Sequence, residues 1–417
     1  MNEYQLFNDG THLIARGGGG GSSSGGGGGG GGSSSGVSTS AGYVGGTSAS
    51  EQFDANIFWF VLIFIAIFLI FKYIAKKYVD QNIAVGTKPE GFIDPFSSKD
   101  ATPEEKKLAT DAKDTFMKFQ SSWSGSDLKA MKEILSDEYF KKMTLELNII
   151  NNYQRQNIME DTKISDTFIF KQNDYSAGFA IYFVASAKDR LVDVKASKDL
   201  FVDNSVFSET WHFTQAGSGY VLGGIDQSTA DASKFDSGIA DFAKSNGFYY
   251  DPDFGWLMMP TRGAIFGPAG FGQADINNHV VGYFKDVVVE FYSYEPRAGT
   301  GIKAMTVAQA ILPKRYDNIL VTEKSWYRFK PKRSGLTKIN TEGNSFNKKF
   351  SVWAARPDHA TSFELLAPNF MEKIYGLDFE INIEVVDNVL YLYCPDLKIN
   401  YQEMLEVLRW AFEEMKL

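Results

Sequence analysis

The chain of 417 residues contains one cysteine, Cys394, and four histidines that show no H-x-H or H-x-x-x-H spacing. A single cysteine excludes an intrachain disulfide and a thiolate-cluster metal site. Because Cys394 lies in an apolar stretch, we expect a buried, unreactive thiol. The sequence also lacks a Walker motif, a G-x-S-x-G motif and a calcium-loop pattern. It therefore predicts no catalytic residues, no metal and no cofactor.

An excess of basic residues is also missing. Lys and Arg number 42 against 51 Asp and Glu, which gives a formal net charge of −9. This balance argues against nucleic acid as the main partner. Apolar residues make up 44% of the chain, so the sequence can bury a core.

The N-terminal tail, residues 1–55, is rich in Gly and Ser, and every residue from Gly17 to Gly36 is one of the two. Such a stretch buries no apolar surface that would offset its backbone entropy. The sequence therefore predicts a low-complexity, disordered spacer over this region.

Residues 56–79 contain the longest apolar run, which is unbroken from Ile57 to Phe71. About 20 apolar residues in a helix cross a bilayer core of about 30 Å. The pattern predicts a single transmembrane helix. The residues assigned to this span are Ile57, Trp59, Phe64, Phe71, Lys72 and Tyr73.

Flanking charge predicts the orientation of that helix. Lys72, Lys76 and Lys77 follow the run, whereas residues 37–56 contain only Glu51 and Asp54 as charged groups. The positive-inside rule places the C-terminal side in the cytoplasm. The sequence thus predicts a single-pass protein of a bacterial-type plasma membrane, with its N-terminus outside and its folded domains cytoplasmic.

After a juxtamembrane linker over residues 80–103, the pattern becomes that of a folded domain, residues 104–230. Thr102 followed by Pro103 and two acidic residues predicts a helix start. Ser126-Asp127 and Ser136-Asp137 predict two further helix starts. After Asp161 the pattern changes to strands, which we expect at 164–170, 179–185, 193–201 and 207–213, with a hairpin at Gly217-Ser218-Gly219 leading into 220–222.

These residues resemble the Tim-forty-four-like domain family. The similarity rests on Phe116, the run Phe119–Trp123, the segments 127–129 and 134–138, and the strand pair around Glu209–Phe213 and Tyr220–Ile225. The family contains the C-terminal domain of a peripheral subunit of the mitochondrial import translocase and bacterial membrane proteins. The resemblance implies a cone-shaped α+β fold of the cystatin or nuclear-transport-factor-two type, with an apolar pocket between helices and sheet.

A second mixed α+β domain is predicted over residues 231–417. We expect strands at 279–284, 287–294, 302–312, 318–322 and 350–354, a hairpin about Asp387-Asn388, and a terminal helix over Tyr401–Met415. Part of this region, from Phe346 to Met371, resembles a bacterial domain family of unknown function. The overall expectation is an α+β protein with one transmembrane helix, a cone domain and this second domain.

Basic residues near the expected membrane form a candidate contact with anionic headgroups. They are Lys76, Lys77, Lys330, Lys332 and Arg333.

Three functions are consistent with these patterns. The first is a non-enzymatic, membrane-anchored binding or scaffold protein whose apolar pocket holds a protein segment or a lipid. The second is an enzyme or carrier that acts on a hydrophobic small molecule in the same pocket, for which Glu209 and His212 are candidates. Their spacing places them on opposite faces of a strand, which disfavours them as a pair. The third is a scaffold for signalling or envelope assembly. The expected partners are the lipid bilayer and a protein or lipid ligand.

Overall fold

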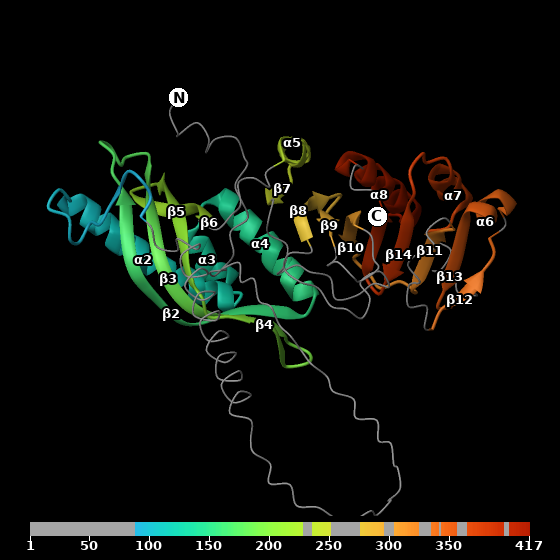
Figure 1. The fold of residues 1–417 in the computed structure, drawn as a ribbon, viewed down its shortest axis with the longest axis horizontal. Coiled ribbons are helices and arrows are strands. Elements are labelled where there is room, and N and C mark those ends of the chain that lie inside the picture. Colours follow the sequence, from blue (N-terminus) through green and yellow to red (C-terminus); the bar gives the residue numbers. More distant parts are fainter. Residues whose placement is uncertain are drawn as a thin grey trace, which may run out of the picture. The chain divides into compact units, whose positions relative to one another are not determined.

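The computed structural model describes residues 88–227, 236–251, 276–295, 304–324, 335–341, 343–356, 365–395 and 400–417 (Figure 1). The Gly/Ser tail and the predicted span at 56–79, with Ile57, Trp59, Phe64, Phe71, Lys72 and Tyr73, lie outside these residues. The same holds for the five basic residues Lys76, Lys77, Lys330, Lys332 and Arg333.

The expected single-pass membrane protein requires correction. No helix in the described part of the chain is both long enough and apolar enough to cross a membrane. The longest, α2 (Pro103–Ser124), carries acidic and basic residues along its exposed side, so its apolar stripe fits one face of a sheet. The predicted fold class with its transmembrane helix, and the localisation that followed from it, are therefore not supported.

In the described part of the chain, three helices lie between β1, the first strand of the first antiparallel sheet, and the other strands of that sheet. After α2 come α3 (Leu128–Ile134) and α4 (Asp137–Asn152). The six strands of the sheet are β1 (Phe92–Ile93), β2 (Arg155–Phe170), β3 (Gly178–Asp193), β4 (Lys198–Asp203), β5 (Val206–Ala216) and β6 (Gly219–Gln227). Their order is β1-β2-β3-β5-β6, and β4 pairs with β3.

The three helix starts are confirmed. Thr102 caps α2 through a capping box, because its hydroxyl accepts from the Glu105 N–H and the Glu105 carboxylate accepts from the Thr102 N–H. Asp127 caps α3 and Ser136 caps α4. Each cap satisfies backbone N–H groups that a helix leaves without partners in its first turn.

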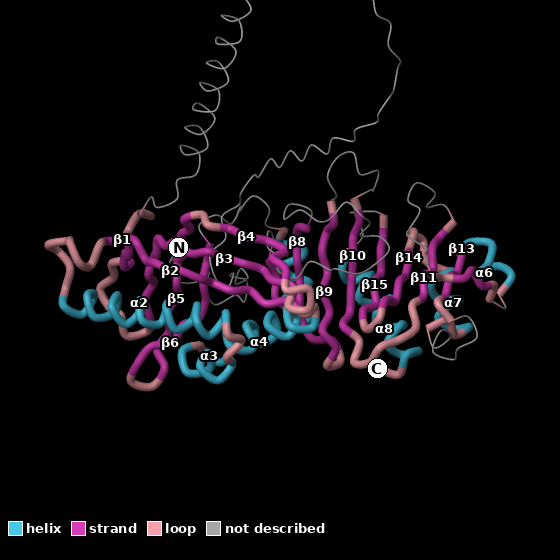
Figure 2. The backbone as a smooth tube through the Cα atoms, turned by 90° about the horizontal axis from the view of Figure 1, so that it is seen from below, coloured by secondary structure: helices cyan, strands magenta, loops and turns pink. Residues whose placement is uncertain are grey.

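The helices lie against one face of the sheet (Figure 2). Aromatic rings fill the space between them: Phe116 and Phe119 of α2 contact Trp211 of β5, with centroid distances of 4.8 and 5.4 Å, and Phe183 of β3 lies 5.0 Å from Phe116. All four side chains are fully buried. The central interior of this layer is therefore packed core.

The second sheet contains nine strands in the order β12-β13-β11-β14-β15-β10-β9-β8-β7. They are β7 (Tyr249–Asp251), β8 (Ile276–Phe284), β9 (Val287–Tyr294), β10 (Met305–Ile311), β11 (Ile319–Glu323), β12 (Thr337–Ile339), β13 (Phe350–Ala354), β14 (Asn382–Val386) and β15 (Val389–Cys394). All pairings between the described strands of the two sheets are antiparallel. Two large antiparallel sheets thus dominate a fold for which the sequence had predicted shorter strands.

Among the described residues, four helices accompany the second sheet: α5 (Ser237–Asn246), α6 (Asn344–Lys349), α7 (Pro368–Tyr375) and α8 (Tyr401–Met415). The predicted bounds of α8 are confirmed, and its stripe from Met404 to Met415 is buried. The hairpin about Asp387-Asn388 is confirmed by the β14–β15 pairing. Cys394 is buried, as expected. The division into domains 104–230 and 231–417 stays a prediction.

Candidate functional site

A groove of about 220 Å³ lies between α2 and the strands β3, β5 and β6. Its lining combines apolar side chains with a polar rim. The lining residues are Glu104, Lys107, Leu108, Asp111, Ala112, Thr115, Phe179, Phe213, Ser218, Gly219 and Tyr220.

Three aromatic rings form the apolar floor of this groove. Phe179 on β3 and Phe213 on β5 are direct cross-strand partners, and their rings stack with centroids 4.6 Å apart. The ring of Tyr220 on β6 meets Phe179 edge to face at 5.1 Å. Aromatic pairs in these geometries are favourable beyond the area they bury, so the floor is preformed.

Gly178 and the β5–β6 turn bring the three strands close together at this end. A Cβ on Gly178, where φ is +153°, would lie 2.3 Å from the carbonyl oxygen of Phe213. Only glycine permits that approach. The hairpin turn at Gly217-Ser218 is confirmed, since Ala216 pairs with Gly219 across it. Ser218 and Gly219 therefore line one wall of the groove.

The opposite wall is one side of α2. Leu108 and Ala112 lie four residues apart, so both face the sheet, and both are buried. Glu104, Lys107 and Asp111 follow the same helical side toward solvent. Thr115 donates its hydroxyl to the Asp111 carbonyl oxygen at 3.0 Å. The rim thus carries two carboxylates and one ammonium group.

A hydrogen-bond chain behind the groove fixes Tyr220 relative to α2. The Tyr220 hydroxyl donates to the Tyr175 carbonyl oxygen at 3.0 Å, and the Tyr175 hydroxyl donates to Glu105 Oε1 at 2.6 Å. Burial disfavours the charged form of Glu105, but the hydrogen bonds from Tyr175 and Thr102 outweigh it and lower the pKa of Glu105 below its ordinary value of 4.5. Burial and the Glu105 carboxylate raise the pKa of Tyr175.

The structure places Glu209 and His212 on opposite faces of β5. Glu209 is buried on the helix side and accepts a hydrogen bond of 3.0 Å from Trp211 Nε1. His212 Nε2 lies 2.7 Å from Asp226 Oδ2 on the other face. The predicted placement of the two side chains on opposite faces is confirmed, and neither lines the groove.

A buried polar cluster connects α4 with the second sheet. His279 Nε2 lies 3.0 Å from Glu290 Oε2, and Gln309 donates to Glu290 Oε1 at 2.7 Å and to the Tyr153 hydroxyl at 2.6 Å. The sequence predicted a strand that starts at His279, whereas β8 starts at Ile276, and His279 is 1% exposed. The register of β8 is irregular between Asn277 and Val280, and Asn278 has a positive φ.

Within the described ranges, no group of three or more His, Cys, Asp or Glu side chains is arranged to hold a metal ion. Sequence reasoning placed the groove residues on the correct elements but did not identify them as a site. It also missed Tyr175 and Gly178. The turn-forming pair Asn173-Asp174 was the available signal for Tyr175, and the glycine itself was the signal for Gly178.

No protein-family model and no curated protein matches the chain. Among solved structures, the chain is similar to the mycobacterial trehalose monomycolate transport factor A, TtfA, at 16% sequence identity and a TM-score of 0.33. The match covers 43% of this chain and 92% of that chain. A TM-score of that size does not establish a shared fold.

Proposed function

We propose that the protein is a non-enzymatic binding module whose groove holds a short segment of a partner protein. The observation that carries this proposal is the preformed aromatic floor of Phe179, Phe213 and Tyr220, open between two rigid elements. Such a site can anchor one large apolar side chain of a partner. In protein–protein interfaces, a few buried side chains of this kind supply most of the binding energy.

The size of the groove favours a protein segment over a whole small molecule. Its volume of about 220 Å³ lies below the roughly 300–1,000 Å³ of pockets that enclose a small ligand. One aromatic or long aliphatic side chain fits a space of this size. Because Glu104 and Asp111 outnumber Lys107 on the rim, we expect a basic residue beside the anchor.

The chemistry of the lining disfavours the enzyme hypothesis. The side chains that line the groove include no histidine or cysteine, and the Thr115 hydroxyl donates to a backbone carbonyl oxygen and not to a general base. The resemblance to the Tim-forty-four-like family, whose implied role is protein or membrane contact, is consistent with a binding module.

The test is selection of dodecamer peptides from a phage-displayed library on the immobilised full chain, with Thr115→Trp as the counter-target. Thr115 is half-buried at the rim, so a tryptophan there fills the groove without opening the core. The proposal predicts enrichment of peptides with one aromatic or aliphatic anchor and an adjacent Lys or Arg. Binding of a dansylated C11 fatty acid that Thr115→Trp abolishes, with no peptide enriched, would favour a lipid instead.

A further inference from the structure

Strand β4 exposes an edge at the end of the first sheet remote from the groove. β5 pairs with β3 over Gly178–Ser186, and β4 pairs with the continuation of β3 over Asp189–Asp193. β6 ends at Gln227, opposite Glu209, and so does not run beside β4. In the described part of the chain, β3 is the one strand that neighbours β4. Edges of this kind accept a further strand.

Apolar side chains gather around this edge. Half of the large hydrophobic side chains that are exposed in the described residues lie on β4, in the turn before it or at the first residue of β5: Val194, Leu200, Val202 and Val206, at 54, 43, 42 and 48%. Val202 is the cross-strand partner of Arg190 and shares its face of the sheet. Exposed apolar groups on an open edge indicate a surface that another chain covers.

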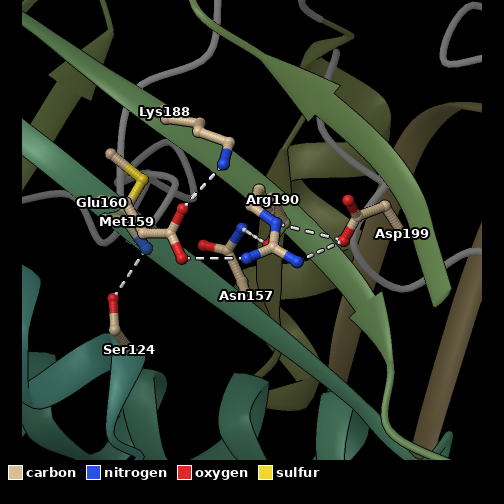
Figure 3. A network of polar contacts seen from close by, with 7 residues as sticks. All are labelled: Ser124, Asn157, Met159, Glu160, Lys188, Arg190 and Asp199. Atoms are coloured by element: carbon tan, nitrogen blue, oxygen red, sulfur yellow. Dashed lines mark hydrogen bonds and ion pairs between the residues drawn. The ribbon is translucent and has the colours of Figure 1, made fainter. Parts of the chain in front are cut away.

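An ion-pair network holds β4 in place before any partner binds (Figure 3). Arg190 on β3 donates from Nε and Nη2 to Asp199 Oδ1 on β4, at 3.1 and 2.7 Å. Its Nη1 donates to Glu160 Oε1 on β2 at 2.8 Å, and Lys188 donates to the other oxygen of Glu160 at 3.0 Å. A fixed edge loses little conformational entropy when a second strand adds to it.

The charges on β4 identify the occupant. Lys198 begins the strand, and Asp203, which is 9% exposed, ends it. Oδ1 of Asp203 accepts from the Ser205 N–H at 2.9 Å, which holds the carboxylate at the end of the strand. A strand that runs antiparallel to β4 and carries a cation opposite Asp203 would complement this edge. β4 of a second copy has that charge order.

We propose that two copies of this chain pair through their β4 edges, antiparallel, about a two-fold axis. The basic start of each β4 then lies beside the acidic end of the other, and Leu200 and Val202 of both copies form one apolar patch. An isologous contact of this kind is self-complementary and closes as a dimer. The interface uses residues separate from the groove, so its outcome is independent of the proposed peptide binding.

Disulfide trapping in the full chain tests the pairing. Cysteine is introduced singly at Leu200, Val202 and Asn204, with the buried Cys394 as a silent background. Copper phenanthroline then oxidises two thiols to one disulfide. Because directly opposed residues of an antiparallel pair lie about 4.5–5.5 Å apart between Cα atoms, at least one of the three positions should give a disulfide-linked homodimer in high yield. Met117→Cys is the control, since Met117 on α2 is 45% exposed.

A charge variant tests whether the same edge drives the association. Val202→Lys, added to the best cysteine variant, should lower the dimer yield at least fivefold, whereas Met117→Lys in the same background should leave it unchanged. No homodimer at any of the three positions, a yield equal to that of Met117→Cys, or a yield that Val202→Lys does not change would overturn the proposal. So would a disulfide to a different protein, because the edge would then bind a foreign strand.

Discussion

The rings of Phe179 on β3 and Phe213 on β5 stack with centroids 4.6 Å apart and planes 7° apart. The two residues are direct cross-strand partners, so the backbone register alone places one ring on the other. Both side chains are buried at the base of the groove. The proposed site therefore depends on the close approach of β3 and β5 at this end of the sheet.

That approach predicts a large effect for Gly178→Ala. The added methyl would lie 2.3 Å from the Phe213 carbonyl oxygen, at a φ that side chains rarely adopt. We expect the free energy of unfolding in urea to fall by about 1–3 kcal/mol. Gly219→Ala is the matched control: its Cβ would meet no atom within 4 Å, so stability should change by less than about 0.5 kcal/mol. Equal losses in both variants would contradict the account.

Acid should weaken the fold partly through Glu105. Because hydrogen bonds lower its folded-state pKa below 4.5, the stabilisation by this carboxylate is present above pH 4.5. It is lost as the pH falls through the lower folded-state pKa. Glu105→Gln should therefore be less stable at pH 7 and show a flatter decline in unfolding free energy below pH 4.5. Glu104→Gln, an exposed neighbour in the same turn, should keep the wild-type decline. A wild-type slope in Glu105→Gln would disprove this assignment.

The buried cluster between α4 and the second sheet predicts a cost for removing one hydroxyl. Tyr153 accepts a hydrogen bond of 2.6 Å from Gln309 and lies 3.4 Å from Glu290. Tyr153→Phe leaves the Gln309 amide without this acceptor, so the unfolding free energy should fall by about 1–3 kcal/mol. Tyr283→Phe removes a hydroxyl from a ring that is 47% exposed and should change stability by less than about 0.5 kcal/mol. Thermal or urea unfolding of the three proteins measures the difference.

The sequence predicted those elements whose signals are local. The capping residues Thr102, Asp127 and Ser136 lie next to the helices they start, and the turn at Asp387-Asn388 lies between its own strands. Each of these features depends on a few adjacent residues. The predicted helix starts and the predicted turn therefore match the structure.

The sequence did not predict features that depend on register between distant residues. β2 begins at Arg155, before residue 164, where we expected the strand to start. The prediction missed this first part because register shifts near Asp161 interrupt the alternation of the strand. The stacking of Phe179 on Phe213 and the burial of His279 against Glu290 depend on how separate strands pair. The ion pair of Arg190 with Asp199 also follows from pairing. Periodicity assigns each residue to one face of its strand, but it does not identify the residue of another strand that lies opposite.

The proposed function is tested most directly by the affinity of one library-selected peptide for three full-length proteins, measured by fluorescence anisotropy. Thr115→Trp, which fills the groove, should weaken binding at least tenfold relative to wild type. Met117→Trp adds the same ring on the exposed side of α2 and should leave the dissociation constant within twofold of wild type. Equal affinity of the peptide for wild type and Thr115→Trp would show that the groove is not its binding site.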